Sequence, residues 1–300
     1  MRLGLALPQL GHFADPSLIG TVAAEAERMG YESLWVGERL HAPLDPLTPY
    51  PGGGGMPELF RASIDPVLAL TLAASHTSRA LLGSSTLNAP LYSPMQLARS
   101  FAGIDQLSGG RLLVGLGLGW CRDEYDAAGV PWHERGARLD ETLDVLETLW
   151  SQDPVKFEGK FWTISPGTFQ PKPVQHPPPV YLGGVSPAAF RRIGRRADGW
   201  LGVPMPVEML RAVLGDIAEH ARAADRDPAA VRSVIRVNAE LTDHAGEGGG
   251  PHRGTVEEIG EYLRGLAALG IADAFVDLQF TTSTPEELLD AAQRIRAACA

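Results

Sequence analysis

The chain has 300 residues, of which 44% are hydrophobic, and it carries a formal net charge of −10 at pH 7. This length and apolar content suit one large α/β domain over residues 1–300 with a packed core. The acidic balance argues against nucleic acid or an anionic membrane surface as partners, and no apolar run is long enough to span a bilayer.

Short apolar runs alternate with amphipathic helical patterns along nearly the whole chain. In chain order, the predicted strand and helix pairs are 3–8 with 15–30, 33–38 with 65–78, 80–87 with 93–107, 111–119 with 136–150, 180–185 with 186–197, 199–203 with 207–224, 231–242 with 255–270, and 272–280 with 284–298. Eight such units predict a (β/α)8 TIM barrel with its site at the carboxyl ends of the strands. A doubly wound open sheet is the alternative, but it would need fewer strands and a phosphate loop after the first one.

Three segments do not fit this repeat. Residues 39–63 are rich in Pro and Gly, residues 155–179 contain a predicted hairpin over 155–164, and residues 244–253 are rich in Gly. Long excursions from a compact domain are usually lids or disordered segments. We expect a mobile lid with few apolar anchors after the second strand, an insertion between the fourth helix and the fifth strand, and a solvated loop over 244–253.

The two cysteines, Cys121 and Cys299, lack metal-ligand spacing, and no histidine forms a metal pattern with another His or carboxylate. We therefore expect free thiols, no metal site and a reducing, cytoplasmic location.

The fourth predicted strand carries Gly115, Gly117 and Gly119 and ends in a polar turn over 120–126. Because glycine has no side chain to pack, its recurrence indicates that a ligand or another backbone passes close to this face. The spacing is not that of a dinucleotide fingerprint, since no helix follows the third glycine at the required distance.

The end of the fifth-unit strand has the composition of an anion-binding turn. Gly183 and Gly184 precede Val185 and Ser186, and Pro187 then stands at the first helical position. The free N–H groups of a helix start can bind phosphate, so this turn is a candidate phosphate cradle. An ordinary βα turn with a serine cap is the alternative.

The third strand is polar at its carboxyl end, where Ser85, Thr86 and Asn88 stand. Polar side chains here indicate contacts to a polar ring of a ligand, although Ser and Thr also commonly satisfy local backbone groups.

Ionisable residues follow the second strand. Glu38 and His41 are candidates for an acid, a base or a substrate clamp. The alternative is a surface ion pair between Glu38 and Arg39.

Together these features resemble the bacterial luciferase-like monooxygenase superfamily, and in particular its oxidoreductases that depend on the deazaflavin coenzyme F420. The most specific matching pieces are residues 107–120 with 124–125, 134–136, 138–141, 169–175, 182–184 and 197–200. The resemblance runs from Met1 to the last helix. It implies a barrel with an insertion and a flavin or deazaflavin at its carboxyl end.

The resemblance also implies roles for individual residues. In similar proteins the third strand carries a non-proline cis peptide behind the cofactor ring, and here it would join Ser85 and Thr86. The implied cofactor-binding set comprises Ser85, Thr86, Leu118, Gly119, Trp120, Glu124, Gly183, Gly184, Val185 and Ser186.

Members that use deazaflavin often have Ser-Asp-His after the second strand, whereas this chain has Gly37-Glu38-Arg39 with a histidine only at position 41. The resemblance thus puts Glu38 in the place of the Asp. The candidate catalytic residues are Glu38, His41 and Asn88.

We therefore expect an oxidoreductase that moves a hydride between F420 and a small organic substrate. Two hypotheses remain beside it, an FMN-dependent two-component monooxygenase and a non-catalytic flavin-binding barrel. A homodimer is also expected, because the helix at 65–78 is apolar over more of its circumference than a one-sided barrel helix needs, and the helix at 93–107 lies next to it.

Overall fold

The computed structural model describes residues 1–247 and 249–299, and within them eight parallel strands close into a barrel. The strands are β1 (Arg2–Ala6), β2 (Ser33–Val36), β3 (Leu81–Ser84), β5 (Leu112–Gly117), β8 (Val180–Gly183), β9 (Gly199–Gly202), β10 (Arg232–Asn238) and β13 (Asp273–Asp277). The pairing of β3 with β5 closes the ring, which confirms the predicted (β/α)8 barrel and excludes the open sheet.

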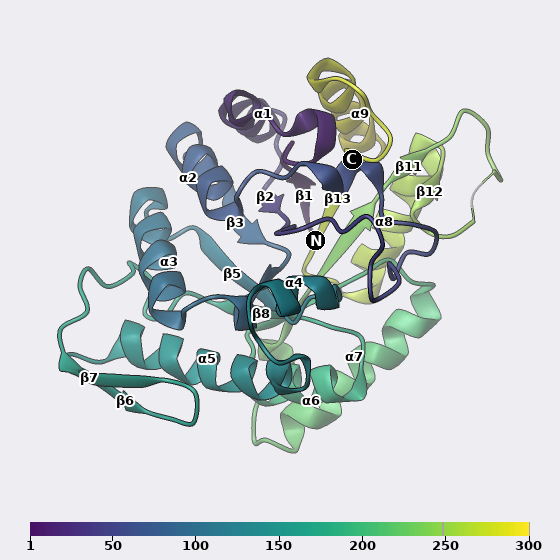
Figure 1. The fold of residues 1–300 in the computed structure, drawn as a ribbon. Helices are drawn as coiled ribbons and strands as arrows, with labels where there is room; N and C mark the ends of the chain where they lie inside the picture. The colour runs from purple at the N-terminus through teal and green to yellow at the C-terminus, as the bar shows by residue number, and fades with distance from the viewer. Residues whose placement is uncertain (248, 300) are drawn as a thin grey trace.

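Helices surround this barrel, as Figure 1 shows. They are α1 (Pro16–Arg28), α2 (Pro66–His76), α3 (Pro94–Ser108), α5 (Arg135–Ser151), α6 (Pro187–Arg196), α7 (Val207–Arg222), α8 (Val256–Leu269) and α9 (Pro285–Ala298). Five of them begin with proline directly after the cap residue, where the missing N–H costs no hydrogen bond. Each of the eight predicted units therefore consists of one barrel strand and one helix.

The structure corrects several predicted boundaries, and two of these corrections concern the segments after β3 and β5. The third strand does not run from 80 to 87 but stops at Ser84, passes through a cis peptide between Ser85 and Thr86, and resumes as β4 (Leu87–Asn88). The cis peptide thus occurs where the resemblance implied it. The segment expected as a polar turn over 120–126 is instead a short helix, α4 (Arg122–Ala127).

The insertion between α5 and β8 is confirmed. It contains an antiparallel hairpin of β6 (Val155–Glu158) and β7 (Thr163–Gly167), which lies at the edge of the molecule in Figure 1. The glycine-rich segment expected as a solvated loop over 244–253 is flanked by a small parallel pair, β11 (Glu240–Leu241) with β12 (Arg253–Gly254). Its residue 248 lies outside the described residues.

The loop over residues 39–63 lies against Trp120 and α4. Tyr50 packs against the rings of Phe60 and Trp120, at centroid distances of 5.6 and 5.4 Å. Thr48 Oγ1 donates to Trp120 O at 2.9 Å, and Leu47 N donates to Asp123 Oδ2 at 3.0 Å. These contacts hold the loop against Trp120 and α4, while Leu44 and Leu47 are 89% and 63% exposed, in line with the expectation of few apolar anchors. Its role as a mobile lid stays a prediction.

The barrel interior is filled by side chains from nearly every barrel strand. A buried layer contains Ala6, Trp35, Leu113, Tyr181, Leu201, Val234 and Phe275. The rings of Trp35 and Phe275 stack at 4.8 Å. Both cysteines are free thiols, and no helix among the described residues has the length and apolarity that a membrane span requires. No cluster of His, Cys, Asp or Glu suited to a metal ion occurs within the same residues.

Candidate functional site

The barrel mouth, where the carboxyl ends of the strands meet, is shaped by a close approach of β3 to β5. A Cβ atom at Gly115 would lie 1.6 Å from Ser84 O, and Ser84 Oγ also bonds both Gly115 N and Gly115 O at 2.9 Å. A Cβ at Gly117 would lie 2.5 Å from Thr86 Oγ1. Gly115 and Gly117 therefore lack a side chain because the adjacent segment at Ser84–Thr86 lies so close, and not because a ligand contacts them.

Glu38 lies shortly after β2 and is partly buried among polar partners. Its Oε1 accepts a hydrogen bond from the Tyr92 hydroxyl, and its Oε2 accepts one from Asn88 N at 2.6 Å. Burial, with a smaller contribution from the charge of Glu124, raises the pKa of Glu38 to about 7, against the opposing effects of these two donors and of Arg39. Burial likewise raises the pKa of Tyr92, and the neighbouring Glu38 adds to that shift.

The surface ion pair considered between Glu38 and Arg39 does not form. Arg39 Nη1 instead lies 3.0 Å from Glu124 Oε1, and both side chains are buried, at 6% and 0% exposure. Glu124 Oε1 also accepts from Leu40 N at 3.0 Å and from His41 N at 3.2 Å. Glu124, which the resemblance puts along the cofactor, thus fixes the start of the loop that follows β2.

Asn88 joins these two carboxylates. Its backbone N–H donates to Glu38, and its Nδ2 donates to Glu124 Oε2 at 3.3 Å. Glu38, Asn88 and Glu124 were all predicted as site residues and lie together. His41 lies close by along the chain, but its side chain is exposed, and only its backbone N–H contacts Glu124.

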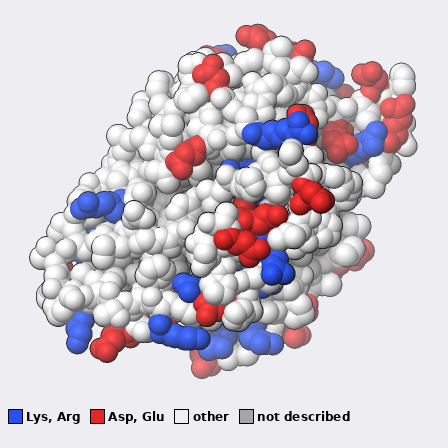
Figure 2. Space-filling model, in the orientation of Figure 1, with Lys and Arg blue, Asp and Glu red and all other residues white. Residues whose placement is uncertain are grey.

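The end of β5 forms a second side of the mouth. Leu118 and Trp120 are half-buried, and Gly119 has a φ of 65°, which is a left-handed conformation that favours glycine. A Cβ at Gly119 would lie 2.8 Å from the side chain of Asn88. Figure 2 shows acidic side chains gathered over α4, which follows this segment.

A polar network inside the mouth escaped the sequence analysis. Arg236 Nη1 donates to Ser85 O at 2.9 Å, and Arg236 Nη2 donates to Asp277 Oδ2. Gln279 Nε2 donates to Asp277 Oδ1 at 3.0 Å, and Gln279 Oε1 accepts from Gln9 N at 2.7 Å. Polar residues two apart at the ends of the last two strands, Arg236 with Asn238 and Asp277 with Gln279, were the available signal.

The turn after β8 opens α6. Gly184 has a φ of 141°, and its Cβ would lie 2.6 Å from Ala189 Cβ, so this position requires glycine. Ser186 Oγ accepts from Ala189 N at 3.2 Å, which is the predicted N-cap. Val185 and Ser186 are exposed, and within the part of the chain that the structure describes their N–H groups donate to no acceptor. Figure 2 shows basic side chains over the α5 and α6 side of this face.

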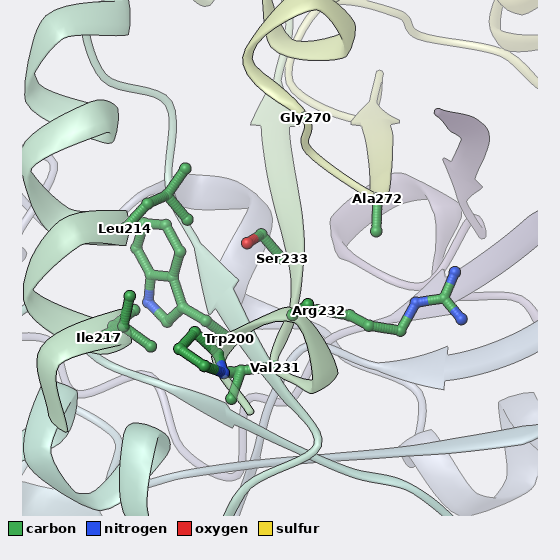
Figure 3. A pocket seen from close by; sticks show the side chains of 11 residues that line it. Trp200, Leu214, Ile217, Val231, Arg232, Ser233, Gly270 and Ala272 are labelled. Atoms are coloured by element: carbon green, nitrogen blue, oxygen red, sulfur yellow. The ribbon is translucent and has the colours of Figure 1, made fainter. Parts of the chain in front are cut away.

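A pocket of about 410 Å³ lies elsewhere, on the outer side of β9 and β10 (Figure 3). It is lined by Trp200 together with Leu214 and Ile217 of α7 and with residues that precede β10 and β13. Figure 3 shows the guanidinium of Arg232 extending away from Trp200. Its walls include the amino ends of strands, so it is separate from the mouth.

Comparison with known proteins gives a family match over most of the chain. The model of the luciferase-like monooxygenase family matches residues 7–247. An uncharacterized protein of Mycobacterium tuberculosis is 35% identical over 214 residues, which cover 70% of this chain and 74% of the relative.

Two relatives with named activities match shorter stretches. An F420-dependent glucose-6-phosphate dehydrogenase of Nakamurella multipartita is 32% identical over 190 residues, 62% of this chain and 52% of that protein. An FMNH(2)-dependent dimethylsulfone monooxygenase of Pseudomonas putida is 37% identical over 136 residues, 44% of this chain and 38% of that protein.

Solved structures share the fold. The monooxygenase RslO1 from Streptomyces bottropensis has a TM-score of 0.81 at 22% identity and covers 99% of this chain and 98% of its own. An F420-dependent secondary alcohol dehydrogenase in complex with an F420-acetone adduct has a TM-score of 0.79 at 19% identity, with 100% and 99% covered. At these identities the likeness shows the architecture alone.

Proposed function

Because the chain belongs to the luciferase-like monooxygenase family, we propose that it is an oxidoreductase that transfers a hydride between coenzyme F420 and a small organic substrate. The observation that carries this proposal is Glu38, a partly buried carboxyl group at the barrel mouth whose pKa is raised to about 7. A group of this kind can take up or release the proton that accompanies hydride transfer at neutral pH. The N. multipartita relative is named as F420-dependent.

The residues at the mouth fit a flat, phosphate-bearing group. The free N–H groups of Val185 and Ser186 at the start of α6 are donors for its phosphate, and the left-handed Gly184 opens that turn. Ser85, Thr86, Leu118, Gly119 and Trp120 would line its ring, with Glu124 fixing the loop beside it. When bound, the deazaflavin supplies the carbon that accepts or donates the hydride.

The chain's own residues then manage the proton. Tyr92 Oη and Glu38 Oε1 are hydrogen-bonded, so a proton can be held between them, and Asn88 N fixes the other carboxyl oxygen. Arg236 holds Ser85 O, which orients the segment that would lie behind the ring. His41 is exposed, and we assign it no step beyond contact with an incoming substrate.

An FMN-dependent two-component monooxygenase is the second candidate. The specific observation in its favour is the 37% identity to the P. putida enzyme, which is named as FMNH(2)-dependent. The raised pKa of the partly buried Glu38 argues against a third reading, a non-catalytic barrel, because perturbed ionisable groups at a barrel mouth are typical of functional sites.

The Gly184→Asp variant tests the phosphate cradle. A carboxylate and a side chain at a left-handed position would both oppose an anion there, so we expect loss of binding for F420 and FMN in fluorescence titrations. Gly215→Asp, at an exposed position of α7 where a Cβ would meet nothing within 4 Å, is the matched control for added charge. Wild-type affinity of Gly184→Asp for both cofactors would show that the phosphate binds elsewhere.

A further inference from the structure

Arg39 is a buried arginine at the barrel mouth whose donors are largely unused. Its side chain is 6% exposed, and its Nε and Nη1 are buried without a hydrogen-bond partner. The ion pair from Nη1 to Glu124 Oε1, at 3.0 Å, lies out of line for a hydrogen bond. A buried polar donor without a partner costs free energy, so an additional acceptor at Nε and Nη1 would be favourable.

Glu124 cannot supply that acceptor. Its Oε1 already accepts from Leu40 N and His41 N, and its Oε2 accepts from Asn88 Nδ2. The carboxylate is therefore occupied by three N–H donors besides the guanidinium it neutralises.

Aromatic rings hold the guanidinium in place. The Arg39 Cζ atom lies 4.9 Å from the ring centroid of Trp120 and 5.4 Å from that of Phe60. Trp120 follows β5, while Phe60 belongs to the loop after β2 and contacts Phe280 after β13 at 6.0 Å. Rings from the loop after β2 and from the end of β5 therefore both lie beside Arg39, which places it at the mouth.

We propose that Arg39 is a substrate-binding residue and that the substrate carries a carboxylate, which its Nε and Nη donors bind as a fork. The proposal rests on the function proposed above and names the class of its substrate. A planar guanidinium with free donors matches a carboxylate in geometry and charge, and the neighbouring rings favour a carboxylate attached to an apolar or aromatic body.

The other charges at the mouth permit a bound anion. Asp277 is paired with Arg236, and Glu124 is paired with Arg39 and three N–H groups. Glu38 is protonated in a large share of molecules at neutral pH, since burial raises its pKa to about 7. A bound carboxylate would share the Arg39 guanidinium with Glu124, whose charge is also stabilised by the three N–H donors.

The test compares benzoate with benzamide, which have the same shape and differ in charge. Binding to the cofactor-loaded protein and to the cofactor-free protein is followed by saturation-transfer NMR for wild type, Arg39→Gln and Arg39→Lys. Arg135→Gln is the matched control, because Arg135 also stacks on a tryptophan, Trp132, at 3.9 Å but donates to Trp132 O.

We expect wild type and Arg135→Gln to prefer benzoate by about tenfold or more, Arg39→Lys to keep part of that preference, and Arg39→Gln to lose it. Equal binding of benzoate and benzamide to wild type would overturn the proposal, as would a full preference in Arg39→Gln. If Arg39→Gln fails to fold, Arg39→Lys becomes the deciding variant. A preference of Arg39→Lys for benzoate equal to that of wild type would then contradict bidentate binding by Arg39.

The two proposals fail in different ways. A benzoate preference that depends on Arg39 in a protein that binds neither F420 nor FMN would support this site and refute the oxidoreductase. Cofactor binding without any preference for benzoate would support the oxidoreductase and refute the carboxylate site at Arg39.

Discussion

Single residues at the mouth show how burial sets chemistry. Glu38 would have an ordinary acidic pKa on the surface, but here it lies between Tyr92 and Asn88 at the end of β2. The two donors favour the ionised form, and burial outweighs them, so the pKa rises to about 7.

This shift has a consequence for stability. The folded protein holds the Glu38 proton more tightly than the unfolded chain does, so the stabilisation is complete below about pH 4.5 and is lost as the pH rises through about 7. Each pKa unit corresponds to about 1.4 kcal/mol, so the effect is on the order of 3 kcal/mol. We expect Glu38→Gln, which resembles the protonated form, to flatten the fall of Tm between pH 5 and 8.

The same variant separates the proton role from a structural role. Turnover by Glu38→Gln should fall and lose its dependence on pH near 7, while its affinity for the cofactor stays near that of wild type. A Tm profile parallel to that of wild type over pH 5 to 8 would contradict the assigned pKa.

Some residues of the site could be predicted from the sequence, and others could not. Glu38, Asn88 and the turn at Gly184 stood out because polar or glycine residues at strand ends are unusual. Arg236 did not, since its partner Ser85 lies 151 positions away and the two meet only when the barrel closes. The ion pair of Arg39 with Glu124 was hidden for the same reason, because Glu124 is distant in sequence and adjacent in space.

At the scale of elements, the order of strands and helices was predictable, and their boundaries were less so. Alternating apolar runs gave all eight strand–helix units, since each strand is buried on both faces. Several strands end before their predicted limits, as β1 does at Ala6 and β9 at Gly202, because the backbone leaves the sheet where residues turn toward the mouth. The short helix α4 was missed, since its few residues give no full helical period.

The contact between β3 and β5 gives a prediction at this scale. Gly115→Ala would place a methyl group 1.6 Å from Ser84 O. This backbone atom cannot move without displacing the end of β3 from its pairing with β5. Overpacking of this kind costs about 1–3 kcal/mol or more. We expect a clear fall in Tm and weakened cofactor binding.

Gly103→Ala, in α3, is the control for that substitution. Its Cβ would meet nothing within 4 Å, so alanine there should stabilise the helix by about 0.5–1 kcal/mol. If both variants had the same Tm, the close approach of β3 and β5 would not matter for stability.

At the scale of the whole molecule, apolar side chains remain exposed on the predicted dimer surface. Leu68 of α2 is 44% exposed, and Met95 and Leu107 of α3 are 44% and 51% exposed. The two helices are neighbours, and a two-fold contact would cover all three side chains. The homodimer and the cytoplasmic location both stay predictions.

Light scattering tests the dimer, which would have twice the chain mass of 32.1 kDa. Leu68→Arg should give the monomer mass without losing cofactor binding. Met209→Arg, on α7 at 56% exposure, should leave the dimer intact. A wild-type mass near 32.1 kDa at micromolar concentration would contradict the prediction.

The central claim is that this barrel uses a deazaflavin, and a direct titration of the purified protein with F420 and FMN tests it most closely. The account predicts that F420 binds at least about tenfold more tightly, a difference of about 1.4 kcal/mol, and that Gly184→Asp abolishes this binding. Tighter binding of FMN would contradict the claim and favour the monooxygenase, and binding of neither would contradict both.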